Sequence, residues 1–148
     1  MSDAPDLPTV IIYTDGACEK NPGRGGWAAI LRFGNTEKVL SGSDPQTTNN
    51  RMELTAAIQA LKALNRPCRV DLYTDSEYLK RGITEWLPAW RARNWRRKGG
   101  ALANADLWQE LDAAMQGHKI LWKWLPGHSG HPSNERVDKL ARQATRKG

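Results

Sequence analysis

The stretch from Thr9 to Asp15 reads TVIIYTD, and the stretch from Arg69 to Asp75 reads RVDLYTD. Each is rich in β-branched and aromatic residues over the length of one strand, and each ends in the tripeptide Tyr-Thr-Asp. The first run is continuously apolar, which is typical of a strand covered on both faces of its sheet. The repeats therefore predict two strands that each deliver an aspartate to the carboxyl edge of a sheet.

The other segments place these strands in a longer series of strands and helices. Strands are predicted over residues 9–14, 26–32, 37–42, 69–74 and 119–125, with a polar loop over residues 17–25. Helices are predicted over residues 48–64, after Ser76, around residues 83–90, after Asn104 and after Ser133. Hairpin strands combined with helical crossovers predict an α/β fold of mixed α+β character, with a mixed sheet between helical layers.

Length and composition are those of one globular domain. The chain has 148 residues, 39% hydrophobic and 26% charged, and we expect a flexible lead at residues 1–8 and a single domain over residues 9–148. No apolar run approaches the ~20 residues of a membrane helix, and the first twenty residues lack the pattern of a secretion signal. Cys18 and Cys68 fit no zinc spacing, so we expect reduced thiols in a cytoplasmic protein.

The chain is basic, and its positive charge is concentrated in one segment. Lys and Arg outnumber Asp and Glu by 22 to 16, which gives a net charge of +6. Five cations with no acid among them follow Trp90: Arg91, Arg93, Arg96, Arg97 and Lys98. Such a run is usually a solvated surface, but here it is interleaved with Trp86, Trp90 and Trp95. The combination favours a nucleic-acid partner, because phosphate neutralisation releases counterions.

Asp15 and Asp75 are the first candidates for a metal site. If their strands are parallel neighbours, the two carboxylates lie about 5 Å apart, and two anions that close share a proton or hold a cation. Oxygen ligands favour magnesium, manganese or calcium over zinc. Each residue also has a structural interpretation, since Asp-Gly is a turn dipeptide and an Asp before Ser76 suits a helix start.

Two further acids lie on predicted helices. Glu53 shares a stripe with small apolar residues, where an unpartnered carboxylate is costly to bury. A capping box from Asn50 to Glu53 explains the same glutamate equally well. Asp138 lies early in the last helix, where the helix dipole alone accounts for an acid.

A loop from Pro126 to Pro132 carries His128 and His131 between glycines and prolines. Neither cysteine lies nearby to complete a zinc site, so a loop histidine that carries protons is the favoured interpretation, with the other histidine on the surface. The glycine-rich segment from Asn21 to Gly26 is neither a phosphate-binding P-loop nor a dinucleotide fingerprint.

Together these motifs resemble bacterial type I ribonuclease H over about residues 10–145. The resemblance rests on YTDGAC with Asn21-Pro-Gly, TTNNRMEL from Thr47, YTDS from Tyr73, the Trp-rich basic segment, Asp106-Leu-Trp108, and WLPGHSGHPSNERVD from Trp124 to Asp138. It implies a ribonuclease H-like fold, a five-stranded mixed sheet with helices on both faces. It also implies a divalent-metal-dependent endonuclease that hydrolyses the RNA strand of RNA/DNA hybrids and leaves 5′-phosphate and 3′-hydroxyl ends.

The resemblance also assigns residues. Asp15, Glu53, Asp75 and Asp138 match the family's catalytic, metal-binding acids for one or two Mg²⁺, with Mn²⁺ as a substitute, and His128 matches its catalytic loop histidine. The matched substrate-binding positions are Asn21, Thr48, Asn49, Asn50, Glu77, Trp86, Trp90, Arg93, Arg96, Arg97 and Lys98. Glu77 departs from the pattern, because relatives often have Gln there. Its negative charge either weakens the contact with the substrate or is turned away from it. The implied partner is the hybrid duplex, bound by a monomer without membrane association.

Two alternatives stay open from the sequence. One is a non-catalytic module that binds hybrids or duplexes, although four carboxylates repel phosphate unless metals lie between them. The other is a nuclease of the same fold that acts on DNA. The Asn49-Asn50 pair and the basic segment favour the hybrid enzyme.

Overall fold

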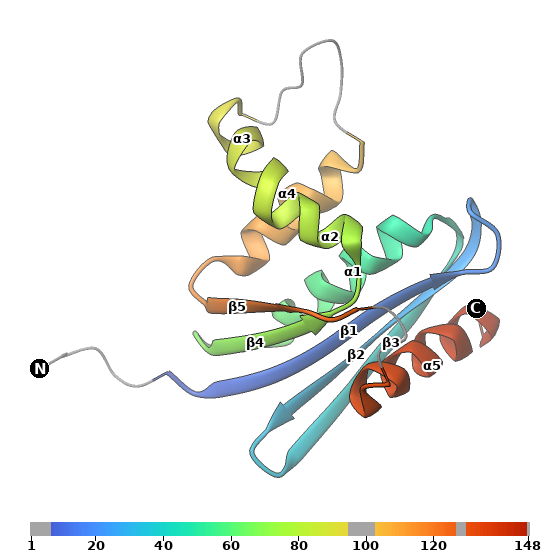
Figure 1. Cartoon of the computed structure of the whole chain (residues 1–148), viewed down its shortest axis with the longest axis horizontal. Coiled ribbons are helices and arrows are strands. Elements are labelled where there is room, and N and C mark those ends of the chain that lie inside the picture. Colours follow the sequence, from blue (N-terminus) through green and yellow to red (C-terminus); the bar gives the residue numbers. More distant parts are fainter. Residues whose placement is uncertain (1–6, 95–102, 127–129, 148) are drawn as a thin grey trace, which may run out of the picture.

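The computed structural model describes residues 7–94, 103–126 and 130–147. Five strands form one sheet in the order β3-β2-β1-β4-β5 (Figure 1). Their bounds are β1 Thr9–Cys18, β2 Gly23–Phe33, β3 Thr36–Thr47, β4 Arg69–Thr74 and β5 Lys119–Trp124. β1, β2 and β3 pair antiparallel, whereas β4 pairs parallel with both β1 and β5. The five-stranded mixed sheet that the resemblance implied is therefore confirmed.

Helices cover both faces of this sheet (Figure 1). On one face lie α1 Asn49–Lys62, α2 Glu77–Arg81, α3 Leu87–Ala92 and α4 Ala105–Met115, with a single π-helical turn over Gly82–Trp86 between α2 and α3. On the other face α5, Pro132–Lys147, packs across β1, β2 and β3. The predicted order of strands and helices is confirmed. In the described part of the chain, no helix has the length and apolar composition that crossing a bilayer requires.

The sheet separates two hydrophobic clusters. The larger lies under α1 and α4 and contains fully buried side chains such as Ile12, Leu54 and Trp108. The smaller lies under α5, where Val137 and Ala141 pack against Tyr13, Ala28 and Ile30. Alternate residues of β1 therefore serve opposite clusters, which explains why its sequence is continuously apolar.

The first two strands are longer than predicted. The predicted polar loop over residues 17–25 is mostly paired strand, because Ala17 pairs with Gly26 and Cys18 with Gly25. Glycine permits this pairing under a helix: a Cβ on Gly26 would overlap the backbone of Thr145 in α5. The polar composition thus reflects close helix packing over a hairpin rather than a loop.

Helix ends differ from two predictions. Thr48, not Asn50, is the N-cap of α1, and its Oγ1 accepts a 3.2 Å hydrogen bond from Arg51 N. Ser133 lies inside α5, which begins at Pro132, a residue suited to a first helical turn. Asn104 is the N-cap of α4 as predicted, but its side chain instead donates to the Tyr78 hydroxyl.

Candidate metal centre and nucleic-acid interface

The parallel pairing of β1 and β4 places two aspartates side by side. Tyr13 pairs with Tyr73, so Asp15 and Asp75 follow at equivalent positions two residues further on. Asp75 comes directly after β4, as the repeated tripeptide predicts. Asp15 does not end its strand, because β1 continues to Cys18 in antiparallel pairing with β2. Asp15 is therefore held by the sheet itself, at the point where pairing with β4 stops.

Glu53 joins the two aspartates from α1. Because Thr48 is the N-cap, the third helical residue is Arg51, and Glu53 is too far along the helix to form the capping box. Its backbone lies against Gly16, where a Cβ would overlap the Glu53 N–H. One carboxylate oxygen from each of Asp15, Glu53 and Asp75 lies within 4.8 Å of the others.

Burial makes these carboxylates hard to ionise without a cation. Asp15 and Glu53 are each only 5% exposed. Burial, followed by the charge of Glu53 and a hydrogen bond to Asp138, raises the pKa of Asp15 to about 11. Burial also raises the pKa of Glu53, although the Ser76 hydroxyl and the Gly16 N–H favour its charged form. A divalent cation would replace the shared protons as the compensating charge.

Asp138 lies on α5 beside the three carboxylates and has two interaction partners, Asp15 and Arg142. Its carboxyl group lies within hydrogen-bonding reach of Asp15. Its Oδ2 also accepts a 2.6 Å hydrogen bond from Arg142 Nη2, one helical turn further along. The tight oxygen cluster thus contains three of the four predicted acids, and the fourth borders it.

The donor set fits a hard divalent cation. All the candidate ligands are carboxylate oxygens, which Mg²⁺ and Mn²⁺ prefer. The buried Oε1 of Glu53 has no hydrogen-bond partner in the described part of the chain, although such an atom normally has one. A cation would satisfy this oxygen. Sequence reasoning assigned no role to Asn134, whose Nδ2 donates to Asp75 Oδ2 at 3.4 Å and orients that carboxylate.

The two loop histidines have different outcomes. His128 lies outside the described residues. His131 is half-buried rather than on the surface, and its ring packs against Tyr13 and Tyr73 with centroids 5.5 and 6.0 Å apart. The sequence left open which of the two histidines is only a surface residue. His131 is not, because it packs on the two tyrosines directly before α5 begins.

The predicted substrate contacts near α1 lie together. Asn21, in the turn between β1 and β2, accepts a 3.2 Å hydrogen bond from Asn49 N through its Oδ1. Asn49 is exposed at the start of α1, whereas Asn50 and the capping residue Thr48 are half-buried. Glu77 is exposed in the first turn of α2, where the helix dipole favours an acid.

The Trp-rich basic segment is only partly an open surface. Trp86 and Trp90 are half-buried and pack against the fully buried Trp108, with centroids 6.5 and 5.4 Å from its ring. They anchor the π-helical turn and α3 to α4. Arg91 pairs with Asp112 of α4, while Arg93 is exposed. Arg96, Arg97 and Lys98 lie outside the described residues.

A polar network that the sequence did not predict connects α1 with α4. Arg51 makes two hydrogen bonds to Asp106, of 3.0 and 2.8 Å, and a third to Asn104 Oδ1. The Tyr78 hydroxyl accepts from both Asn104 and the Trp108 indole N–H. Residues between 26 and 55 positions apart give no local pattern from which such contacts can be predicted.

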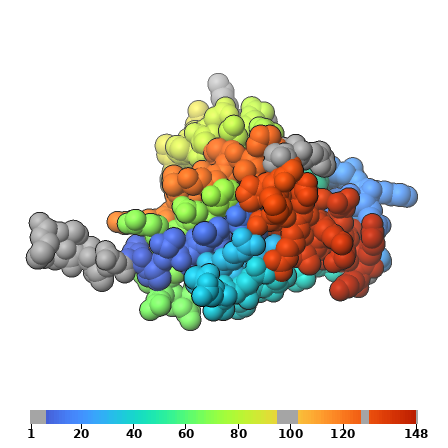
Figure 2. Space-filling view, turned by 60° about the horizontal axis from the view of Figure 1, so that its bottom comes forward, coloured from blue at the N-terminus to red at the C-terminus, as the bar shows by residue number. Residues whose placement is uncertain are grey.

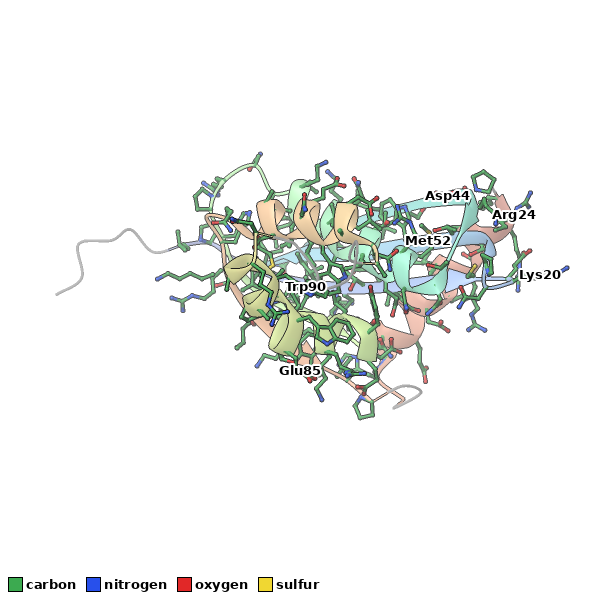
Figure 3. The ribbon with its side chains drawn as sticks, turned by 90° about the horizontal axis from the view of Figure 1, so that it is seen from above. Lys20, Arg24, Asp44, Met52, Glu85 and Trp90 are labelled. Atoms are coloured by element: carbon green, nitrogen blue, oxygen red, sulfur yellow. The ribbon has the colours of Figure 1, made fainter. Side chains whose placement is uncertain are left out.

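A pocket of about 310 Å³ adjoins the acids on the side of α5. Its lining includes Gly16 and Cys18 from β1, Asn49 from α1, and Asp138 and Arg142 from α5. In Figure 3 the labelled Met52, which precedes Glu53, lies between Trp90 and the hairpin tip that carries Lys20 and Arg24. The acids are thus flanked by α3 on one side and by the β1–β2 hairpin on the other.

Comparison with known proteins agrees with this arrangement. The RNase H family profile matches residues 8–146. The chain is 60% identical over 136 residues to a ribonuclease H of Cupriavidus pinatubonensis, covering 91% of this chain and 94% of that protein. It is 61% identical over 137 residues to a ribonuclease H of a Polaromonas species, covering 90% and 86%.

Solved structures show the same fold. LC9-RNase H1, a type 1 RNase H with the type 2 active-site motif, superimposes with a TM-score of 0.89 at 37% identity over 99% of this chain and 75% of that one. LC11-RNase H1, solved in complex with an RNA/DNA hybrid, shares the fold with a TM-score of 0.72 at 24% identity over 93% and 97% of the two chains. From the family match along nearly its whole length, the chain belongs to the ribonuclease H family.

Proposed function

We propose that this protein is an endonuclease that hydrolyses the RNA strand of RNA/DNA hybrids and leaves 5′-phosphate and 3′-hydroxyl ends. The observation that carries the proposal is the group of three carboxylates within 4.8 Å of one another, in a chain of the ribonuclease H family. Residues 9–148 would act as one catalytic domain, and residues 1–8 would not be needed.

Asp15, Glu53 and Asp75 are the proposed ligands of Mg²⁺ or Mn²⁺, with Asp138 completing the set when one or two ions bind. When bound, such ions activate a water and stabilise the leaving 3′ oxygen of an in-line displacement. Asn134 holds the Asp75 carboxylate in place through its side-chain amide. The sheet and α1 exclude water from Asp15 and Glu53, which are both buried.

Proton transfer is assigned to His128, on the basis of the family resemblance. Its place between glycines allows an imidazole to reach a bound phosphate without being fixed as a ligand. His131 would instead support the site, since it packs on the tyrosines that precede Asp15 and Asp75.

Hybrid selectivity must come from residues outside the acids. Asn21, Asn49 and Asn50 are the proposed minor-groove contacts, which read 2′-hydroxyl groups on one strand. The basic segment after Trp90 is the proposed contact with the DNA strand, through Arg93, Arg96, Arg97 and Lys98. Asn21 and Asn49 already form one hydrogen-bonded unit next to the acids.

One assay tests the proposal against its alternatives. End-labelled RNA is offered alone, in an RNA/RNA duplex and in an RNA/DNA hybrid, each with Mg²⁺ or with a chelator, alongside labelled DNA duplex. Cleavage of the hybrid RNA alone, abolished by the chelator, supports the proposal. Binding without cleavage would support a non-catalytic module, and cleavage of the DNA duplex would support a DNA nuclease.

A further inference from the structure

The tip of the β1–β2 hairpin is held in one position beside α1. Asn21 in the turn accepts from Asn49 N, and Glu19 N donates to Arg24 O at 2.9 Å. The Cys18 thiol donates to Lys20 O at 2.8 Å. These contacts fix the backbone from which two cationic side chains, Lys20 and Arg24, extend into solvent (Figure 3).

These two cations have no carboxylate partner in the described part of the chain. Most arginines elsewhere on the described surface are paired: Arg32 and Arg136 with Glu37, Arg51 with Asp106, Arg81 with Glu85, Arg91 with Asp112 and Arg142 with Asp138. An exposed cation without a partner keeps its full charge for a ligand and loses no ion pair on binding.

A third cation, Arg146, joins them from α5, and it too has no carboxylate partner among the residues that the structure describes. A Cβ on Gly26 would overlap Thr145 N, so the end of α5 lies directly on the hairpin. In Figure 2 the red surface of α5 borders the blue surface of the hairpin. Arg146 is exposed and lines the 310 Å³ pocket together with Gly16 and Asp138. The pocket therefore places Arg146 beside Asp138, and Cys18 and Glu19, which directly precede Lys20, line it as well.

The position of these cations matches the path of the strand that is cut. Asp15 and Cys18, which ends β1 at the base of the tip, are three residues apart, which is about 10 Å or about three nucleotides along one strand of a duplex. In the proposed reaction the scissile phosphate belongs to the RNA strand and lies over Asp15, and an RNA backbone that continues along β1 toward the hairpin brings its next phosphates to the tip. The pocket is also lined by two acids, Glu19 and Asp138. On the hairpin tip and the end of α5, however, Glu19 is a single acid beside Lys20, Arg24 and Arg146.

We propose that Lys20, Arg24 and Arg146 form a phosphate-binding surface, the tip patch, that holds the RNA strand on the side of the acids away from α3. The inference rests on the proposed function and extends it. With the tip patch, the protein contacts the hybrid on both sides of the cleavage site. The basic segment after Trp90 contacts it on one side only.

The test is the salt dependence of hybrid binding, measured by fluorescence anisotropy in EDTA so that no cleavage occurs. The triple variant Lys20→Ala, Arg24→Ala, Arg146→Ala is compared with a control of the same charge change, Lys38→Ala, Arg66→Ala, Arg69→Ala. The control cations are exposed, lie near the start of β1 at the opposite end from the acids, and have no carboxylate partner within residues 7–94, 103–126 and 130–147. We expect the log–log salt slope to flatten by about 2 to 3 in the tip variant and to stay unchanged in the control.

Neutral methylphosphonate linkages identify the strand. Placed in the RNA strand on the tip side of the cut, they should weaken binding by the parent protein and not by the tip variant. An equal slope in the two variants would overturn the tip patch, and a response only to linkages in the DNA strand would overturn its assignment to RNA. Failure of the parent protein to cleave the hybrid in Mg²⁺ would instead overturn the proposed function. Because anisotropy in EDTA measures binding without cleavage, it tests the tip patch separately from that function.

Discussion

Tyr13 and Tyr73 pair on the parallel strands β1 and β4, and their rings stack with centroids 4.9 Å apart. The contact fixes the relative height of the two strands two residues before Asp15 and Asp75. A slip of one residue would turn one aspartate to the opposite face of the sheet. The stack, covered by His131, therefore sets which carboxylates meet.

The first prediction concerns the acids. Asp15→Asn or Asp75→Asn should abolish cleavage while hybrid binding stays the same or becomes tighter, because a metal ligand is lost and repulsion of phosphate is relieved. Single-turnover cleavage in Mg²⁺ and anisotropy in EDTA measure the two effects. Full cleavage by either variant at ordinary Mg²⁺ would show that the metal site is wrongly assigned.

The second prediction concerns stability without metal. Burial first, and then the neighbouring acids, raise the pKa of Asp15 from 3.8 to about 11, so between these values the folded state keeps a proton that the unfolded state releases. The free energy of unfolding should therefore fall as the pH rises through this window. Asp15→Asn cannot ionise, so its Tm in EDTA at pH 8 should exceed the parent's by at least about 3 °C. Thermal unfolding from pH 5 to 9 checks this, and parallel curves for the two proteins would contradict it.

The third prediction separates the two loop histidines. His128→Ala should lower kcat by about 10²–10⁴-fold and keep the metal requirement and KM, as expected for a proton carrier. His131→Phe keeps a ring on Tyr13 and Tyr73, so it should retain most activity, while His131→Ala should lower the Tm. Single-turnover rates from about pH 6 to 9 decide between them. If His131→Phe cleaves more slowly than His128→Ala, the proton carrier is His131 and not His128.

The fourth prediction divides the basic segment. Arg91 is paired with Asp112, so Arg91→Ala should reduce stability and leave the salt slope of hybrid binding nearly unchanged. Neutralising Arg93, Arg96, Arg97 and Lys98 together should flatten that slope by up to about 3 to 4, with kcat nearly unchanged. If the four-residue variant keeps the parental slope, the segment is only a solvated surface.

The fifth prediction concerns the packing beneath α3. A Cβ on the buried Gly82 would overlap the ring of Trp108. This ring is fully buried in a close-packed core, so it has little space into which it can move. Gly82→Ala should therefore lower the free energy of unfolding by about 1–3 kcal/mol. Thr84→Ala, an exposed change in the same turn, is the control. Urea unfolding of both variants measures the difference, and equal midpoints would show that Trp108 moves freely.

Local pattern was sufficient for much of the fold. Apolar runs and helical stripes predicted the order of all the elements, because alternation and the 3.6-residue period depend on near neighbours alone. Boundaries were less predictable. The Gly-rich sequence of the hairpin predicts a loop, whereas its glycines make room for α1 and α5, and neither helix can be inferred from the sequence of the hairpin itself.

The residues of the candidate site also fall into two groups, those that the sequence indicates and those whose role depends on tertiary packing. From the sequence alone, Tyr-Thr-Asp could be placed on each of two strands, and the motifs indicated Glu53, Asp138 and His128 by family resemblance. The packing of strands and helices was needed to show that Glu53 is no capping residue, that Asn134 holds Asp75 and that Arg142 contacts Asp138. It was also needed to show that His131 and Trp90 pack against buried rings. The physical reason is that the charge state and exposure of a side chain depend on what packs around it. Those neighbours come from strands and helices far apart in the chain, which meet only when the sheet forms.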